Sequence, residues 1–236
     1  MTSLTHLQSF LEMHNYHKKH CERPNLQRGH YPFVTISRET GAGGHALAEA
    51  VIKQLKKSQV NEGEDWRVFD QEVCRMVVED PTVKVSLERM LSEEYHSQIE
   101  DMFQELICGE SSQDAVIKKI FKIFHMLAHF GKVILVGRAG HLVTRDLPYG
   151  IHIRLIAPED KRAVRMRQLL KLDEKHAREL IRQQDRSRQR LVKTYFNHDI
   201  ENPLDYDVTW NTGGISVDLI AENVVSLIQH RMKAVL

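Results

Sequence analysis

The sequence has few cysteines, almost no net charge and no long apolar segment. Its 236 residues include three cysteines, Cys21, Cys74 and Cys108, and no two of them have the CxxC spacing of a redox or zinc motif. The formal net charge of +1 gives no whole-molecule attraction to a nucleic-acid polymer or a membrane surface. No apolar segment approaches the roughly 20 residues that span a bilayer, and the first residues lack the apolar core of a secretory signal. We therefore expect a cytoplasmic protein that binds neither nucleic-acid polymers nor membranes.

What the sequence does contain is an alternation of strand-like and helix-like segments. The strand signals lie at residues 33–37, 66–69, 132–136, 151–156 and 206–210. The helical patterns lie at residues 45–57, 113–130, from Pro158 onward, and at 216–233. Strands that alternate with helices pair in parallel through right-handed crossovers. The expected fold class is therefore α/β, a three-layer α/β/α sandwich with a parallel five-stranded sheet.

Three segments depart from this alternation. Residues 1–30 are predicted to be an N-terminal extension, with a polar helix at 4–20 that could mediate a homo-oligomer. Residues 70–112 are predicted to be a mostly helical insertion that is acidic in its second half, whereas residues 161–190 are strongly basic. The predicted domain is thus residues 31–236.

A glycine-rich turn in "FVTISRETGAGGHALAEAV" joins the first strand to the first helix. Gly41, Gly43 and Gly44 allow backbone N–H groups to point at a phosphate, and the helix that follows adds the positive end of its dipole. The usual lysine is absent, since Gly44 stands at its position, and the nearest cation is Arg38, with Glu39 beside it. We interpret the turn as a phosphate-binding loop; a plain strand-to-helix turn is the alternative.

Three further motifs carry cations or turn residues. The strand in "VILVGRAGHLV" leads to Arg138, and ligands of doubly wound sheets bind at the carboxyl ends of strands. Arg138 is therefore either a ligand contact or a structural arginine that ties two loops together. The cluster "DRSRQR" brings Arg186, Arg188 and Arg190 close together, which suits a polyanion. The turn in "YDVTWNTGG", residues 206–214, could line a base pocket or be only a turn.

Two groups of histidines have helical spacing. The first group is His14, His17, His20 and Cys21. It could bind a metal, but the lysines at 18 and 19 would oppose a cation, so we do not predict a metal site there. The second group, His125 and His129, lies among apolar residues of one helix and is interpreted as packed or rim histidines rather than ligands.

Taken in this order, the motifs resemble the cytidylate kinase-like family of P-loop nucleoside monophosphate kinases, over about residues 33–230. "RETGAGGHA" is similar to the cytidylate kinase loop GPSGAGKST, and "SRETGAGG" to the form SRExGSGG of the cytidylate kinase-like branch. "GRAG" is similar to GRDxG, "IRLIAPEDKRAVR" to FLDASPEERARRR, and "DRSRQR" to the lid signature DRDRNR. The resemblance implies a nucleoside monophosphate kinase fold, with a monophosphate-binding insertion at 70–112 and an arginine-rich lid at 171–200.

The resemblance also implies roles for the matched residues. The loop residues Thr40, Gly41, Ala42, Gly43, Gly44 and His45 would bind the phosphates of ATP. Asp70 and Arg138 would bind the acceptor. The lid residues Arg186, Arg188 and Arg190 would be catalytic, because they would fold over the transferring phosphate.

Some residues depart from the family pattern, and they shape the expected chemistry. Arg38 is expected to be the catalytic cation that replaces the missing lysine. The implied cofactors are ATP and Mg²⁺. The Ser/Thr pair of the loop is replaced by His45 and Ala46, so the metal would be held mainly by phosphates and water, or by Glu39 or Asp70. The family's aspartates in GRDxG and in the lid are replaced at the positions of Ala139 and Ser187.

The expected function is a nucleotide kinase with small-molecule nucleotide substrates. It would transfer the γ-phosphate of ATP to a small acceptor, by resemblance a pyrimidine monophosphate such as CMP or dCMP. Two alternatives stay open: a nucleotide-binding regulatory module that has lost turnover, and a kinase of a non-nucleotide acceptor on the same scaffold.

Overall fold

The computed structural model describes residues 31–57, 66–70 and 112–235. Its centre is a five-stranded sheet in the order β2-β3-β1-β4-β5. The strands are β1 (Phe33–Arg38), β2 (Arg67–Asp70), β3 (Val133–Val136), β4 (Gly150–Ile156) and β5 (Val208–Asn211). Every neighbouring pair is parallel, so all five carboxyl ends lie at one edge of the sheet. The predicted parallel sheet and its five strands are confirmed.

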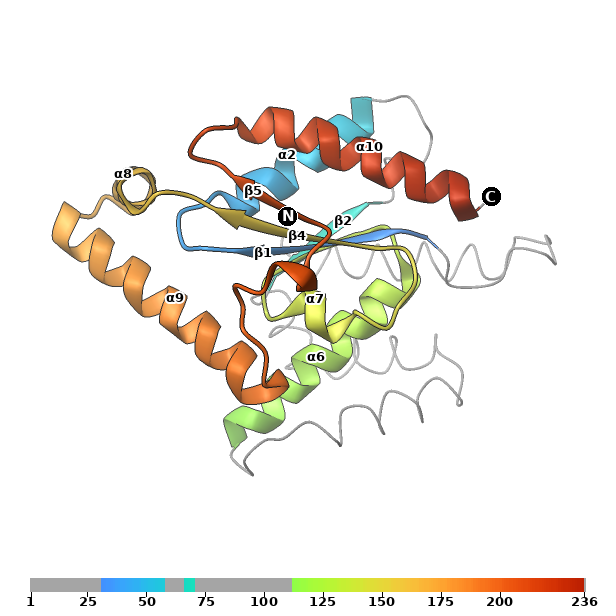
Figure 1. Cartoon of the computed structure of the whole chain (residues 1–236), viewed down its shortest axis with the longest axis horizontal. Coiled ribbons are helices and arrows are strands. Elements are labelled where there is room, and N and C mark those ends of the chain that lie inside the picture. The colour runs from blue at the N-terminus through green and yellow to red at the C-terminus, as the bar shows by residue number, and fades with distance from the viewer. Residues whose placement is uncertain (1–30, 58–65, 71–111, 236) are drawn as a thin grey trace.

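Helices cover both faces of this sheet (Figure 1). The helices are α2 (Gly44–Lys57), α6 (Ser112–Phe130), α7 (Gly140–Val143), α8 (Glu159–Leu170), α9 (Glu174–Phe196) and α10 (Val217–Val235), with a short 3-10 turn, η1, at Pro203–Asp205. α2 and α10 lie together on one face, and α6 and α7 lie on the other (Figure 1). This arrangement is the three-layer α/β/α sandwich expected from the alternation of strands and helices.

The face under α2 and α10 is apolar and mostly aliphatic. Its buried strand residues are Val34, Ile36, Ile134, Val136, Ile151, Ile153 and Leu155. They pack against α2 and α10 through residues such as Leu47 and Val224, both of them inaccessible to solvent. Each such side chain contributes about 1.5–3 kcal/mol through burial. This cluster is the main core of the domain.

The opposite face is apolar at one end and polar at the other. Near the amino ends of the strands, Phe33 and Val133 belong to a buried cluster with Phe121 and Phe124 of α6. Toward the carboxyl ends, the side chains on this face become polar. The buried polar residues of β1 and β4 there are Thr35, Ser37 and Arg154.

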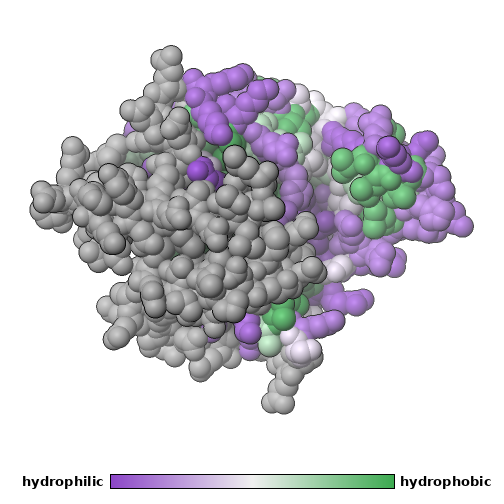
Figure 2. All heavy atoms as spheres, turned by 180° about the vertical axis from the view of Figure 1, so that it is seen from behind, coloured by the Kyte–Doolittle hydropathy of each residue, from purple (hydrophilic) through white to green (hydrophobic). Residues whose placement is uncertain are grey.

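α8 and α9 divide the basic segment at residues 171–173. Lys171 has a left-handed backbone (φ 54°) that ends α8, and the Asp173 side chain accepts a hydrogen bond from the His176 N–H over 2.9 Å to cap α9. The two helices then pack against each other. Figure 2, the view from behind, shows apolar side chains among hydrophilic ones at this end of the molecule, and α8 carries the exposed Val164, Leu169 and Leu170.

Several sequence predictions concern residues that lie outside the described ranges. They are the helix at 4–20, the metal alternative at His14, His17, His20 and Cys21, and nearly all of the insertion at 70–112, so the domain boundaries stay predictions. Within the described part, His125 is buried and its Nε2 lies 3.1 Å from an oxygen of Asp146, and half-buried His129 packs edge-on against Phe130. None of the described helices is long and apolar enough to cross a membrane.

Candidate active site

The glycine-rich loop turns its carbonyl groups outward and its N–H groups inward. The carbonyl oxygens of residues 40–42 accept hydrogen bonds from Arg162, Arg165 and Thr212, over 3.2, 3.2 and 2.9 Å in that order. Within the described part of the chain, the N–H groups of Gly43 and Gly44 have no acceptor. They lie at the N-terminus of α2, where the helix dipole is positive. The loop is therefore built to bind an anion.

The turn at 211–214 braces this loop. Thr212 donates its hydroxyl to the loop at Ala42 and accepts a hydrogen bond from Arg165 over 2.8 Å. Arg165 in turn donates to the carbonyl of Thr212 over 2.6 Å. Of the two interpretations left open for residues 206–214, the described contacts are those of a turn that holds the glycine-rich loop in shape.

Two glycines in the loop have backbones that other residues rarely adopt. Gly41 has φ +80° and Gly43 has φ +93°. A Cβ at Gly41 would also come within 2.9 Å of the Arg162 carbonyl oxygen, so α8 packs directly on the loop. Glycine is thus required here for both conformation and close approach.

Arg38 takes the space that a lysine side chain would need. A Cβ added at Gly44 would lie 3.0 Å from Cγ of Arg38 and 3.2 Å from its Cδ. Further along, a Cβ added at Gly137 would lie only 1.8 Å from Nη1 of Arg38. The Arg38 stem therefore passes over Gly44, and its guanidinium lies against Gly137. The absence of a side chain at position 44 is a condition for this placement of Arg38.

The guanidinium of Arg38 lies in a cavity of about 270 Å³ between the sheet edge, α7 and α9. The cavity is lined by Ser37, Arg38, Val136, Gly137, Arg138, Ala139, His141, Gln184, Ser187, Arg188, Leu191, Val192 and Ile200. Three of these residues are arginines and none is acidic. Segments distant in the sequence, the ends of β1 and β3 and the middle of α9, thus converge on one cationic cavity.

Two arginines of the cavity, Arg38 and Arg188, have lowered pKa values. Burial, together with the charge of Arg188, lowers the pKa of Arg38 to about 10, while Asp70 acts in the opposite direction. Burial also lowers the pKa of Arg188. Both groups stay protonated at neutral pH, and both would be stabilised by an anion bound beside them. The electrostatics favour a phosphate or another anionic group.

Asp185 joins α9 to the glycine-rich loop. Its Oδ1 accepts hydrogen bonds from the Thr40 N–H over 2.7 Å and from Arg188 Nη1 over 2.9 Å. Its Oδ2 accepts one from Arg162 Nη1 over 2.7 Å. Arg188 also contacts the Thr40 hydroxyl. Sequence reasoning gave Asp185 and Arg162 no role. The available signal for Asp185 was its position as the one acidic residue of the basic motif "DRSRQR".

The three arginines of "DRSRQR" differ in their position on α9. Arg188 lines the cavity, but Arg186 and Arg190 are exposed and do not line it. An α-helix turns by about 100° per residue, so neighbours two positions from Arg188 point to the other side of α9. Of the three, the structure brings Arg188 to the cavity, and the catalytic role expected of Arg186 and Arg190 stays a prediction.

The other predicted site residues lie at the border of the loop. His45 is largely exposed, and its Nδ1 lies 3.9 Å from an oxygen of Asp70 at the end of β2. Glu39 Oε2 accepts the N–H of Ala157 over 2.9 Å and lies 3.4 Å from Nε of Arg162. Glu39 therefore anchors the loop to the end of β4.

The candidate metal ligands do not form a ready-made cluster. The described residues include no group of three or more His, Cys, Asp or Glu side chains arranged to hold a metal ion. A magnesium ion that arrives with ATP would be held by phosphates and water, and Asp70 is the carboxylate beside the loop. The donor set fits a metal carried by the nucleotide.

The turn after β3 holds Arg138 in a strained backbone. Arg138 and Ala139 both have φ of 52°, and Gly137 before them has φ +88°. Left-handed backbone at residues other than glycine costs of order 1 kcal/mol each and is concentrated at functional sites. The turn directs Arg138 to the cavity and starts α7.

The family model for the cytidylate kinase-like family matches residues 33–213. The chain belongs to this family. No curated protein matches the chain. Among solved structures, an uncharacterized protein from Eubacterium ventriosum has the same fold, with a TM-score of 0.64, 19% identity and coverage of 84% of this chain and 98% of that chain. Shikimate kinase from Bacteroides thetaiotaomicron is similar at a TM-score of 0.45 and 15% identity, over 86% of this chain and 98% of that one.

Membership of the cytidylate kinase-like family confirms the resemblance stated from the motifs. The matched range begins at the first residue of β1 and ends in the turn after β5, so it contains the glycine-rich loop, the turn at Arg138 and the whole of α9.

Proposed function

We propose that this member of the cytidylate kinase-like family transfers the γ-phosphate of ATP, carried with Mg²⁺, to a pyrimidine nucleoside monophosphate such as CMP or dCMP. In this reaction an oxygen of the acceptor phosphate forms a bond to the γ-phosphorus. The bond from that phosphorus to the β,γ-bridging oxygen breaks, and ADP leaves.

The observation that carries the proposal is the placement of Arg38. Its guanidinium shares a cavity with Arg138 and Arg188, next to loop N–H groups that have no acceptor in the described part of the chain. Phosphoryl transfer requires in-line positioning and cations around the transferring group more than covalent chemistry. In this proposal the loop binds the phosphates of ATP, Arg38 replaces the loop lysine, and Arg138 and Arg188 bind the acceptor phosphate and the charge that develops during transfer.

The position of α9 supports water exclusion. α9 covers the cavity and is tied to the loop through Asp185. A covered site favours transfer to the acceptor over hydrolysis of ATP by water. Asp70 would complete the ligands of the magnesium that comes with ATP.

A coupled ADP-release assay tests the proposal with the full chain, ATP, Mg²⁺ and a panel of CMP, dCMP, UMP, AMP and GMP. Turnover that is highest with CMP or dCMP supports it. Titration calorimetry with ATP and Mg²⁺ runs in parallel. Heat of binding without turnover on any acceptor would favour a nucleotide-binding module. If the titration gives no heat and the assay shows no turnover, the kinase assignment is ruled out.

A further inference from the structure

His141 is a buried polar side chain in the wall of the cavity. It lies on α7, its exposed fraction is 3%, and it is one of the residues that line the cavity. Its Nε2 is buried and has no hydrogen-bond partner within the part of the chain that the structure describes. More than nine in ten buried polar groups in folded proteins have a partner, and leaving one without costs about 1–3 kcal/mol. His141 thus brings an unused hydrogen-bonding atom to the wall of the cavity.

The imidazole of His141 is held in place by its neighbours. It packs against the ring of Tyr206 in a tilted arrangement, with centroids 4.5 Å apart and an interplanar angle of 32°. Tyr206 is itself fixed, because its hydroxyl donates to the carbonyl of Ile200 over 2.8 Å. The ring thus keeps its position without a ligand. A ligand that forms a hydrogen bond with it therefore loses little free energy to immobilising the side chain.

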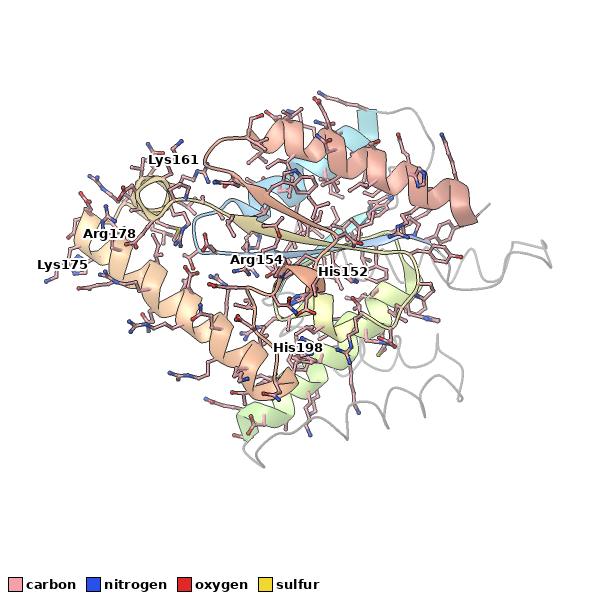
Figure 3. All side chains as sticks on the ribbon, viewed as in Figure 1. His152, Arg154, Lys161, Lys175, Arg178 and His198 are labelled. Atoms are coloured by element: carbon pink, nitrogen blue, oxygen red, sulfur yellow. The ribbon has the colours of Figure 1, made fainter. Side chains whose placement is uncertain are left out.

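His141 is also uncharged at neutral pH. Burial lowers its pKa to about 3, and the nearby His152 and Arg154 add to this effect. Figure 3 shows His152 and Arg154 on β4 and His198 beyond the end of α9, all on the side of the sheet that α7 covers. A neutral ring nitrogen recognises a hydrogen-bonding group and does not compete with the arginines for an anion.

The cavity therefore has two chemically different parts. The charges that act on Arg38 include those of Arg138 and Arg188, so these three form one cationic group. The remaining polar side chains of the lining are Ser37, His141, Gln184 and Ser187, and none of them is charged at neutral pH. Beside His141, the Ser37 hydroxyl offers a second polar group to the cavity and receives a hydrogen bond from Arg154 over 3.3 Å.

We propose that His141 is a specificity-determining residue, which hydrogen-bonds an uncharged polar group of the acceptor while the arginines bind the acceptor's phosphate. This inference rests on the proposed function, because it assigns a contact within the same acceptor site. The ligand class it selects is a phosphate ester whose remaining part carries a neutral hydrogen-bonding ring, such as a pyrimidine nucleoside.

The test compares His141→Phe with the wild-type full chain. Phenylalanine keeps the ring that stacks on Tyr206 and removes both ring nitrogens. The KM for CMP, or for the best acceptor of the panel, is expected to rise about 10- to 100-fold, with the KM for ATP within twofold. Inorganic phosphate would bind through the arginines alone, so its inhibition constant Ki is expected to stay within twofold of the wild-type value. His141→Asn, which restores a hydrogen-bonding group, is expected to recover part of the loss.

His125→Phe is the matched control. His125 has the same exposed fraction of 3% but lies on α6 and does not line the cavity. Thermal unfolding of all three variants separates loss of folded protein from loss of recognition. His125→Phe is expected to lower the Tm without changing the KM for the acceptor.

The outcomes distinguish the two proposals. If wild type turns over CMP and His141→Phe has the same KM within twofold, the role of His141 is overturned and the kinase assignment stands. If His141→Phe raises the Ki of phosphate as much as the KM of CMP, the residue shapes the whole cavity and the recognition role is again overturned. If wild type neither binds nor phosphorylates any acceptor, both proposals are overturned.

Discussion

The two faces of the central sheet are built from the same strands but have opposite chemistry. On the face under α2 and α10, β1 and β4 present Val34, Ile36, Ile153 and other aliphatic residues. On the face toward α7, the same two strands present Thr35, Ser37 and Arg154, also buried. Burial of polar groups costs free energy unless they are hydrogen-bonded. The comparison teaches that one face supplies stability, while the other gives up some of it to place polar groups next to the cavity.

The largest effect is expected at Arg38, which lies where the two faces meet at the end of β1. Arg38→Ala removes the cation that we propose takes the place of the loop lysine, and kcat should fall by about 10³-fold or more. The free energy of unfolding should change little or rise, because a buried guanidinium with a lowered pKa is removed. Steady-state kinetics and urea unfolding measure the two quantities. Arg182→Ala, at an exposed position of α9, is the control, and an unchanged kcat in Arg38→Ala would refute the role of this arginine.

Neighbouring residues of β1 provide the most direct test of the comparison. Ile36 and Ser37 face opposite sides of the sheet. Ile36→Ala should lower the free energy of unfolding by about 2–5 kcal/mol, because it leaves a cavity in the core, with kcat per folded molecule unchanged. Ser37→Ala should change stability by about 1 kcal/mol at most and should instead raise the KM for the acceptor. Chemical unfolding and steady-state kinetics measure both effects in both variants. A large loss of stability in Ser37→Ala together with a raised KM in Ile36→Ala would contradict the comparison.

Low pH should reduce the free energy of unfolding through the buried histidines of the polar face. An unfolded histidine binds a proton below about pH 6.5, whereas burial lowers the pKa of His141 to about 3 and also lowers that of His152. The contribution of His141 to stability is therefore complete above about pH 6.5 and is lost as the pH falls toward 3. His141 adds up to about 1.4 kcal/mol per pH unit to the slope in that window, and the lowered pKa of His152 acts in the same direction. Urea unfolding at pH 7, 6 and 5 should give this slope, and His141→Phe should reduce it; an equal slope in the variant would show that His141 titrates normally.

The smallest effect is expected at Tyr206. Its hydroxyl donates to the Ile200 carbonyl and lies 3.3 Å from the Ser37 hydroxyl. Tyr206→Phe removes these bonds but keeps the ring that stacks on His141, so stability should fall by about 1 kcal/mol. Thermal unfolding detects a change of this size. A drop several times larger would mean that the polar face contributes to stability as much as the aliphatic one.

The strands, the parallel sheet and the glycine-rich loop could be predicted because each has a local signal. Runs of β-branched residues mark β1 and β3, and glycines between a strand and a helix mark the loop. The short helix α7 was not predicted, because its start depends on left-handed backbone at Arg138 and Ala139 that no local pattern indicates.

The contacts of the site depend on residues distant in the sequence. Asp185 and Thr40 are 145 positions apart, and only packing of α9 on the loop brings them together. The space for Arg38 likewise depends on two glycines from different turns. One signal was available and was not used. A parallel strand covered on both faces is normally apolar throughout, so the alternating polar residues of β4, "GIHIRLI", pointed to a functional face.

The length of α9 has a mechanical consequence. The helix runs unbroken for 23 residues from its pivot at Lys171 and Asp173, and Asp185 lies about 18 Å along it at 1.5 Å per residue. A tilt of roughly 10° about that pivot would swing Asp185 by about 3 Å, more than its hydrogen bonds to the loop can stretch. The other end of α9 opposes such a tilt, because Val192 and Tyr195 are buried in the core. α9 is therefore fixed at both ends, which keeps Asp185 at a constant distance from the loop.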